Sequence, residues 1–294
     1  MSDGTVSWRR LRTETAALHG EPHARWLCEE ASGAFGDEFD DVLDEPATVR
    51  GVARLDSMIA RLHEGEPLQY VLGHWSFRRL DLLVDRRVLI PRPETELVAG
   101  VAIDIARARH TVRQADGAPV RCVDLGTGSG AIGLSLLAEL PRGAAEVWLT
   151  DASSDALDVA RANAAGLGIA AAGARFGHGS WFEALPTDLR GTIDVVVSNP
   201  PYVAAGDPAL EASVAEWEPA AALCSGPDGL DDVRAIVAAA PHWLASGGAL
   251  VLEIGTGQGS AVAALATTAG FVDVQVRADH AGHERIVLAT APRN

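Results

Sequence analysis

A glycine-rich turn between an apolar strand and an apolar helix constrains the fold of this chain most strongly. Residues 120–125 are typical of a buried strand, residues 126–130 read Gly-Thr-Gly-Ser-Gly, and an apolar helical pattern follows at 132–140. Glycines allow the backbone to pass close to a ligand, and a helix N-terminus offers free N–H groups and the positive end of a dipole. The sequence therefore predicts a ligand site where this strand meets its helix.

A carboxylate at the end of the next strand extends this prediction. Residues 146–151 read as a second strand that ends in Asp151, roughly 20 residues after the glycines. A carboxylate there can accept hydrogen bonds from both hydroxyls of a ribose, so the two signals together predict a nucleoside-binding α/β unit. They do not identify the nucleoside, because residues 126–131 also satisfy the looser dinucleotide pattern that ends in alanine.

The tetrapeptide Asn199-Pro200-Pro201-Tyr202 follows a further apolar strand at residues 193–198. Each proline fixes its φ and lacks an N–H, so the turn is stiff and presents its carbonyls without competing donors. Together with the asparagine side chain, these acceptors suit holding a substrate NH₂ group while its nitrogen attacks an electrophile. The alternative interpretation is a tight surface turn, since Asn-Pro and Pro-Pro are common in loops.

The tetrapeptide also separates two kinds of cofactor that the glycine turn leaves open. A rigid set of acceptors has no role in hydride transfer, but it suits the alkylation of an amide or amine nitrogen. The combination therefore favours a sulfonium cofactor over a dinucleotide.

The remaining pattern alternates strands with helices, which predicts an α/β fold with a doubly wound, mostly parallel sheet. The loop before the last strand is too short for a crossover helix, so we expect the final two strands to be antiparallel. The expected helices cover residues 94–109, 131–140, 155–166 and 230–244. The expected strands cover residues 120–125, 146–151, 174–176, 193–198, 249–254, 272–277 and 285–289.

Three parts are expected along the chain. Residues 1–73 carry apolar residues such as Leu55, Ile59 and Leu62 at helical spacing, which predicts a small helical domain. Residues 74–90 change to two short alternating strands around a charged turn, which predicts a β-hairpin linker. Residues 91–294 are expected to form the large α/β domain.

Four segments resemble the bacterial HemK/PrmC family of release-factor glutamine methyltransferases, and together they span nearly the whole chain. They are residues 66–73, 89–96, 124–130 and 198–202. Asn-Pro-Pro-Tyr alone is shared with adenine-modifying DNA methyltransferases, but Ile-Pro-Arg-Pro-Glu-Thr-Glu at residues 90–96 looks like the release-factor enzymes specifically. The resemblance implies a class I S-adenosylmethionine-dependent methyltransferase fold, Rossmann-like, with a C-terminal antiparallel strand.

The same resemblance implies an activity. The expected reaction transfers a methyl group from S-adenosylmethionine, leaving S-adenosylhomocysteine, to the side-chain amide nitrogen N5 of a glutamine. That glutamine is expected in the Gly-Gly-Gln loop of class 1 peptide chain release factors, with the helical N-terminal domain recognising the substrate. Two other hypotheses stay open, namely methylation of adenine or another exocyclic amine in nucleic acid, and a non-catalytic nucleoside-binding adaptor.

The motifs and the resemblance together name the candidate site. The expected catalytic residues are Asn199, Pro200, Pro201 and Tyr202. The expected cofactor-binding residues are Asp124, Gly126, Thr127, Gly128, Ser129, Gly130, Asp151, Ser180, Trp181 and Asn199. The expected substrate-binding residues are Pro91, Arg92, Pro93 and Glu94, together with the Asn-Pro-Pro-Tyr tetrapeptide.

The nitrogen of a glutamine amide is a poor nucleophile, because it shares its lone pair with the carbonyl. The Asn199 side-chain oxygen and the Pro200 carbonyl are expected to accept its two hydrogens, so that the remaining lobe points at the methyl group. Tyr202 is expected to pack against the substrate, with core packing as its alternative role.

Adenine recognition departs from the family's pattern. Many relatives carry an acid immediately before the tryptophan, where this chain has Ser180. A serine oxygen accepts a hydrogen bond more weakly than a carboxylate does, so we expect stacking on Trp181 to carry more of the recognition.

Composition limits the partners. The formal net charge is −16 and the sequence has no evident basic stripe, which argues against DNA as the substrate. The cysteines Cys28, Cys122 and Cys224 are scattered without metal-ligand spacing, so we expect reduced thiols and no metal. An apolar secretory segment is absent from residues 1–10, and we expect a cytoplasmic, monomeric enzyme that does not enter membranes.

A second glycine turn, at residues 253–259, mimics the first and also follows a strand. In a doubly wound sheet the ligand lies beside the first strand, at the point where the strand order reverses. We therefore interpret the second turn as structural.

Overall fold

The structure, a computed structural model, describes residues 6–113, 117–208 and 210–293. Contacts divide the chain into two compact units, Met1–His74 and Trp75–Asn294. The boundary falls at the first residue of strand β1 (His74–Phe77), so the remainder of that strand belongs to the second unit.

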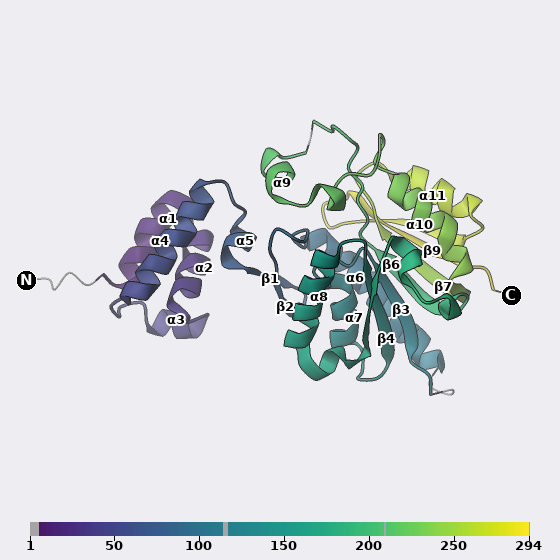
Figure 1. The fold of residues 1–294 in the computed structure, drawn as a ribbon, viewed down its shortest axis with the longest axis horizontal. Helices are drawn as coiled ribbons and strands as arrows, with labels where there is room; N and C mark the ends of the chain where they lie inside the picture. Colours follow the sequence, from purple (N-terminus) through teal and green to yellow (C-terminus); the bar gives the residue numbers. More distant parts are fainter. Residues whose placement is uncertain (1–5, 114–116, 209, 294) are drawn as a thin grey trace, which may run out of the picture. The chain divides into compact units, whose positions relative to one another are not determined.

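The described part of the first unit is helical. Its helices are α1 (Trp8–His19), α2 (Glu21–Ser32), α3 (Asp37–Asp41), α4 (Val49–His63) and α5 (Leu68–Leu72) (Figure 1). The Ser7 hydroxyl accepts a hydrogen bond from the N–H of Arg10 at the start of α1, and the Thr48 hydroxyl accepts one from Gly51 at the start of α4. Caps of this kind each stabilise a helix start by about 1 kcal/mol.

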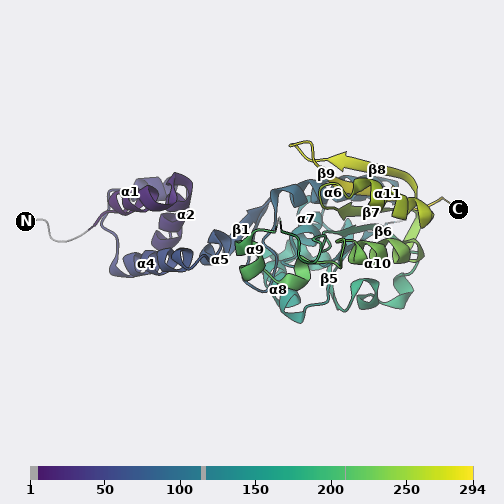
Figure 2. The ribbon, with the colours of Figure 1, turned by 90° about the horizontal axis from the view of Figure 1, so that it is seen from above.

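Helix α2 packs against both α1 and α4, and Figure 2 shows it between them. The apolar faces of these helices meet in a core in which Leu27, Phe39 and Leu55 are almost fully buried. The edge of the Trp8 ring contacts Phe39, with the ring centroids 6.4 Å apart.

One partly buried ion pair explains part of the family-like segment at residues 66–73. The Arg61 guanidinium donates to both carboxylate oxygens of Glu66, at 2.7 and 2.8 Å. It also donates to the carbonyls of Tyr70 and Val71 in α5. Because a bidentate arginine also satisfies these backbone oxygens, it fixes α5 against the end of α4.

The second unit begins with the hairpin of β1 and β2 (Leu80–Leu83). Arg78 adopts a positive φ of 52° in its turn. Its guanidinium donates to both carboxylate oxygens of Glu139, at 2.6 and 2.9 Å. The charged turn predicted between the two strands therefore holds the hairpin against the rest of the second unit.

The main sheet of the described residues has seven strands in the order β5-β4-β3-β6-β7-β9-β8. β9 runs antiparallel to both of its neighbours, whereas the pairs from β5 through to β7 are parallel. The strands are β3 (Val120–Leu125), β4 (Ala145–Asp151), β5 (Ala174–His178), β6 (Ile193–Ser198), β7 (Leu244–Glu253), β8 (Val272–Ala278) and β9 (Glu284–Thr290). The helices are α6 (Pro93–Arg113), α7 (Ala131–Glu139), α8 (Ser154–Leu167), α9 (Ala212–Trp217), α10 (Asp231–Ala239) and α11 (Gly259–Thr268).

Helices cover both faces of this sheet. Gly133 of α7 lies so close to Leu149 that an added Cβ would be 2.9 Å from its Cγ, and close to Asp124 as well. Asp124 lies in β3, and its neighbours in that strand, Val123 and Leu125, belong instead to the apolar cluster that includes α10. Since successive side chains of a strand point to opposite faces, α7 and α10 lie on opposite faces. Burial on both faces explains why β3 and β6 are mostly apolar.

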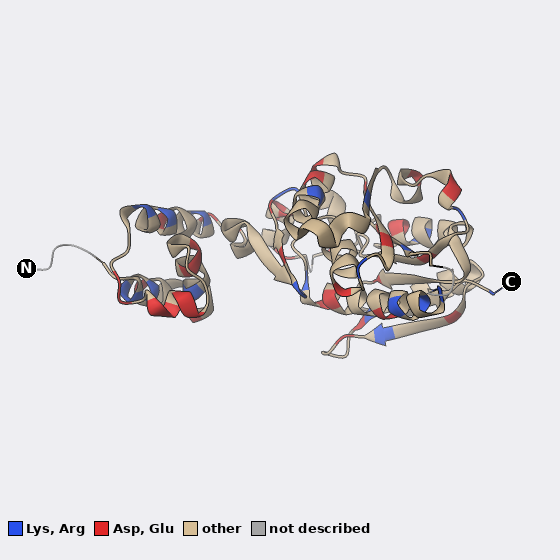
Figure 3. Ribbon diagram, turned by 90° about the horizontal axis from the view of Figure 1, so that it is seen from below, with Lys and Arg blue, Asp and Glu red and all other residues tan. Residues whose placement is uncertain are grey.

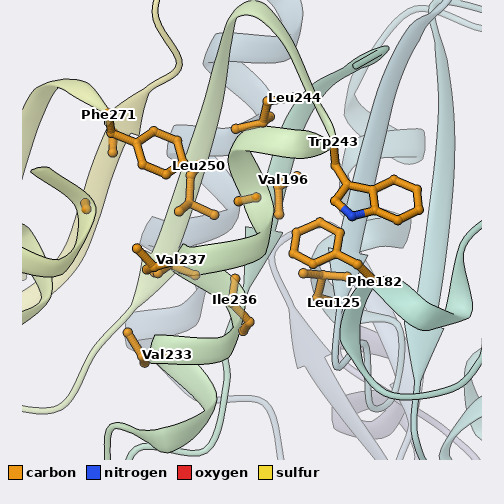
Figure 4. Packing of buried hydrophobic residues seen from close by; sticks show 14 of the residues in the cluster. Leu125, Phe182, Val196, Val233, Ile236, Val237, Trp243, Leu244, Leu250 and Phe271 are labelled. Atoms are coloured by element: carbon orange, nitrogen blue, oxygen red, sulfur yellow. The ribbon is translucent and has the colours of Figure 1, made fainter. Parts of the chain in front are cut away.

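Figure 4 shows the cluster between the sheet and α10. The Phe182 and Trp243 rings stack there with centroids 5.6 Å apart. Side chains from the sheet and from α10 complete the packing, namely Leu125, Val196, Leu250, Val233, Ile236 and Val237.

These observations confirm the predicted fold class, including the antiparallel C-terminal pair. The helix predicted at residues 230–244 is wrong at its end. α10 stops at Ala239, a 3-10 turn covers Ala240–His242, and Leu244 already belongs to β7. Pro241 accounts for the difference, because proline lacks the N–H that continues a helix and its ring clashes with the preceding turn.

We expect Leu149→Ala to lower the free energy of unfolding by about 2–5 kcal/mol, because Leu149 is fully buried between the sheet and α7 and its removal leaves a cavity. Ile169→Ala is the matched control, since that side chain is 66% exposed and its loss should change stability by about 0.5 kcal/mol at most. Urea denaturation of both variants measures this, and equal losses would contradict the packing described.

Candidate active site

Neighbouring parallel strands of the sheet end at the same level. In the strand register Leu125 pairs with both Thr150 and Ser198, and Ser198 pairs with Leu252. Each strand thus delivers its next residue to one edge of the sheet. Those residues are Asp151 at the end of β4, Gly126 after β3, Asn199 after β6 and Glu253 at the end of β7.

A cavity of about 410 Å³ opens at this edge. It is lined by residues from every motif that the sequence analysis connected with the cofactor. These are Asp124, Gly126, Thr127, Gly128, Ser129, Asp151, Ser180, Trp181 and Asn199. Gly130, also expected there, does not line the cavity but forms the N-cap of α7 with a φ of 88°.

Asp124 organises the glycine turn from beneath. Its Oδ2 accepts hydrogen bonds from the Thr127 hydroxyl at 2.6 Å and from the N–H of Gly133 at 2.8 Å. Burial raises the pKa of Asp124 to about 6, although these two bonds oppose the shift. Its other oxygen, Oδ1, is buried and has no hydrogen-bond partner among the described residues. Asp124 therefore combines a structural role with a free acceptor at the cavity wall.

The Asp151 carboxylate is held by backbone amides. Oδ2 accepts from the N–H of Gly128 at 2.9 Å, and Oδ1 accepts from the N–H of Ser153 at 2.9 Å. Each carboxylate oxygen has a second lone pair, so both can still accept a ribose hydroxyl. The Gly128 N–H already donates to Asp151, so it is not available to a ligand. What Gly128 offers a ligand is the open space where a side chain would otherwise stand.

Trp181 has a positive φ of 46°, a conformation that costs a non-glycine residue about 1–3 kcal/mol. Its ring lies over the glycine turn, since a Cβ added to Gly126 would be 3.3 Å from Trp181 Cζ3. The strained residue therefore places an aromatic ring along the cavity, where it is available to pack against a planar base.

Asn199 lines this cavity and also a second one of about 600 Å³. The Asn199 Nδ2 donates a hydrogen bond to the Thr95 hydroxyl at 3.2 Å. The second cavity is bordered by Arg92, Tyr202, Leu210, Glu211 and Arg285, among others. Asn199 thus lies in the walls of both cavities.

Tyr202 is largely buried beside this junction. Its hydroxyl donates to Glu253 Oε1 at 3.4 Å, and burial, reinforced by the Glu253 carboxylate, raises the pKa of the phenol. The Tyr202 carbonyl accepts from Gln258 Nε2 at 3.1 Å, while Gln258 Oε1 accepts from the N–H of Gly255 at 2.8 Å. The second glycine turn lines neither cavity, and its glutamine instead holds the loop that carries Tyr202.

Glu218 connects the segment at residues 90–96 with the loop after β6. Its side chain is 1% exposed, and its carboxylate accepts from the N–H of Ile90 at 3.0 Å and from the Arg92 guanidinium. Pro91 lines the first cavity and Arg92 the second. This partly buried ion pair therefore holds a segment that contributes to the walls of both cavities.

Some expected residues line neither cavity, and some residues that line or support the cavity walls were missed. Pro93, Glu94 and Pro200 line neither, while Pro201 lines the first and Tyr202 the second. Thr95, Glu218, Glu253 and Gln258 were not predicted as site residues. Glu253 could have been found from the sequence as an acid at the end of a buried strand. Thr95 could have been found as a polar side chain inside the segment at residues 90–96.

The described residues contain no group of three or more His, Cys, Asp or Glu side chains placed to hold a metal ion. No helix in residues 6–113, 117–208 and 210–293 combines the length and the apolar character that crossing a membrane requires.

Comparison with known proteins agrees with this geometry. The Methyltransferase small domain family matches residues 110–217. The release factor glutamine methyltransferase of Burkholderia pseudomallei is 44% identical over 89% of both chains. The release factor glutamine methyltransferase of Vibrio cholerae is 39% identical over 85% of this chain and 80% of its own. Among solved structures, the hMettl16 catalytic domain is similar in fold, with a TM-score of 0.53 and 14% identity over 81% of each chain.

Identity of this extent across a catalytic unit and the segments before it goes beyond a shared fold. On these grounds the chain belongs to the release factor glutamine methyltransferase family.

Proposed function

We propose that this protein transfers a methyl group from S-adenosylmethionine to the side-chain amide nitrogen of the glutamine in the Gly-Gly-Gln loop of class 1 peptide chain release factors. The observation that carries the proposal is the position of Asn199 in the walls of both cavities. A residue that reaches two ligands can hold the acceptor nitrogen toward the methyl donor, which is the main requirement of a group transfer between bound molecules.

The first cavity suits the cofactor. Asp124 Oδ1 is a buried acceptor without a protein partner, Asp151 presents two oriented oxygens, and Trp181 offers a ring. A Cβ on Gly128 would meet nothing within 4 Å, so the glycine leaves its space to a ligand. When bound, S-adenosylmethionine supplies an electrophilic methyl group on a sulfonium sulfur.

The second cavity suits the acceptor glutamine. An Asn199 Oδ1 that accepts an amide N–H holds the nitrogen beside the first cavity and stabilises the positive charge that develops there. Pro200 lines neither cavity, so its carbonyl as a second acceptor stays a prediction. No strong base is required, because the alkylated amide nitrogen is acidic and loses its extra proton readily.

The flanking glycines of the acceptor loop fit this arrangement. A site that closes around an amide admits an extended chain only where the adjacent positions carry little bulk. The helical first unit would then bind the body of the release factor. It exposes large apolar side chains that its own core does not use, among them Leu18, Phe35 and Val49.

Gly128→Val should abolish S-adenosylmethionine binding while the protein stays folded, because the branched side chain would enter the cofactor's space. Gly257→Val is a matched control, since Gly257 has a similar positive φ, also meets nothing within 4 Å, and lines neither cavity. Both variants carry the backbone strain, so calorimetric titration isolates the steric effect. Equal affinities for the two variants would place the cofactor elsewhere.

Asn199→Ala should slow methyl transfer by about 10²-fold or more, the scale for losing one preorganised contact in the transition state. Cofactor affinity should change little, because the other contacts of the first cavity remain. Single-turnover kinetics and intact-peptide mass spectrometry with a purified release factor measure both the rate and the modified residue. A wild-type rate, or a methyl group on another residue, would show that this mechanism is wrong.

Removal of residues 1–73 should raise the KM for the intact release factor, while the rate with a short Gly-Gly-Gln peptide stays close to that of the full chain. The second unit has its own core, so the deletion tests recognition. Steady-state kinetics with both substrates provides the comparison, and circular dichroism checks the fold of the shortened chain. A KM that does not change with the intact factor would assign its recognition to the second unit.

Nucleic acid should not be a substrate. The net charge is −16, and arginine and acidic residues are interspersed over the second unit in Figure 3. A protein that binds a phosphate backbone requires concentrated basic surface. Transfer of a labelled methyl group to duplex and single-stranded DNA is the assay, and salt-sensitive incorporation into adenine would favour the adenine alternative.

A further inference from the structure

The second cavity has few side chains that can donate a hydrogen bond to a ligand. The Asn199 Nδ2 donates to the Thr95 hydroxyl at 3.2 Å, which leaves Oδ1 as the atom that Asn199 offers a substrate. The Tyr202 hydroxyl donates to another protein side chain at 3.4 Å. Among the described residues that line this cavity, the other side chains with N–H donors are those of Arg92 and Arg285.

An acceptor glutamine has two polar ends that the site must satisfy. Its NH₂ group requires an acceptor, which is Asn199 Oδ1 in the mechanism proposed above. Its amide oxygen requires a donor, because a carbonyl that leaves water without a new partner loses the hydrogen bonds that water supplied. A guanidinium group in the wall of the second cavity is suited to supply that donor.

Arg92 is held firmly in this wall. It follows Pro91, which lines the first cavity, so the segment that carries it contributes to both cavities, as Asn199 does. Its Nη2 donates to Glu218, whose side chain is 1% exposed and also accepts from the N–H of Ile90 at 3.0 Å. An arginine has five N–H donors, so this bond leaves others for a ligand.

Arg285 is held differently. Its Nε lies 3.5 Å from Asp279 Oδ2, and the same Nε is buried without a hydrogen-bond partner in the described chain. Arg285 also lines the second cavity alone. The amide oxygen is therefore better matched to Arg92, which is fixed by a short charged hydrogen bond.

The charge of Arg92 bears on which side chain the cavity accepts. An uncompensated guanidinium would bind a carboxylate more strongly than an amide, and it would oppose the positive charge that develops on the acceptor nitrogen. The buried Glu218 carboxylate offsets this charge while lining neither cavity itself. Asp207 and Glu211 also line the second cavity, and their charges disfavour a carboxylate further.

We propose that Arg92 donates a hydrogen bond to the side-chain amide oxygen of the acceptor glutamine, and that Glu218 makes Arg92 selective for this neutral group by holding and neutralising it. The proposal rests on the function proposed above and names how that site distinguishes glutamine from glutamate. Arg92 contacts the substrate, whereas Glu218 is a positioning residue that acts through Arg92.

The experiment measures the binding of a Gly-Gly-Gln peptide and of the same peptide with glutamate in place of the glutamine. Calorimetric titration of protein saturated with S-adenosylhomocysteine gives the two dissociation constants, and their ratio is the selectivity. The wild type should prefer glutamine by about tenfold or more. Glu218→Gln keeps the size of the side chain but removes its charge, so the preference should fall about tenfold.

Two double variants test whether the effect passes through Arg92. Arg92→Gln combined with Glu218→Gln has no charge at either position but keeps an N–H donor, so its selectivity should return to within about twofold of the wild-type value. Arg92→Met combined with Glu218→Gln has no donor at the first position. It should bind the glutamine peptide about tenfold more weakly than the other double variant, the scale of one lost hydrogen bond.

Glu139→Gln is the matched control. The Glu139 side chain is 7% exposed and is paired with Arg78 in the same unit, but it lines neither cavity. The substitution therefore changes the net charge by the same amount and weakens a comparable ion pair, and its selectivity should equal that of the wild type. Circular dichroism of each variant checks the fold.

The outcomes separate the two proposals. Wild-type protein that methylates no glutamine of a release factor overturns the proposed function, and this inference with it. If the wild type is active but Glu218→Gln weakens both peptides alike, the role of Glu218 in selectivity is wrong. A selectivity that changes in Glu218→Gln but is not restored by adding Arg92→Gln would show that the effect does not pass through Arg92. Equal affinities of the two double variants for the glutamine peptide would show that Arg92 does not donate to it.

Discussion

The register of the parallel strands is the constraint on which the site depends. β4, β3, β6 and β7 are hydrogen-bonded so that their carboxyl ends lie within one residue of the same level. In a parallel sheet all carboxyl ends meet at one edge, so residues distant in sequence reach the same place without long loops. Asp151, the glycine turn, Asn199 and Glu253 are neighbours for this reason. A register change in any one strand would displace its contribution by more than 3 Å, the rise of one residue.

Burial of carboxylates at this edge costs stability. Asp124 and Glu253 both have a raised pKa because they are buried, which means that the folded protein loses stability as the pH rises through the range between their ordinary and their raised values. Both carboxyls also accept hydrogen bonds from neighbouring groups: Asp124 from the Thr127 hydroxyl of the glycine turn and Glu253 from the Tyr202 hydroxyl. A neutral side chain of similar size would avoid the cost, but it would not impose a direction on its donors. The buried carboxyls thus orient their hydrogen-bond donors at some cost in the stability of the fold.

Local chemistry explains what could be predicted from the sequence. The glycine turn, the acid that ends the next strand and the Asn-Pro-Pro-Tyr tetrapeptide each show their property within a few residues, and β3 and β6 follow from mostly apolar sequences. The missed residues act over distance instead. Thr95 reaches Asn199 across 104 positions, and Glu218 reaches Ile90 across 128. No periodicity encodes such pairs, since they exist only once the sheet is assembled. The end of α10 was missed for another reason, because the apolar run continues through Pro241 into β7.

The two glycine turns show why local pattern alone does not assign a function. Both follow a buried strand, and Gly128 and Gly257 share a positive φ with open space around them. They differ in their place in the strand order. The first turn follows β3, next to the acid at the end of β4, and its space faces a cavity. The second follows β7, where its glutamine holds the backbone of Tyr202. The same backbone geometry therefore makes space for a ligand at one strand and supports the loop beside Asn199 at the other.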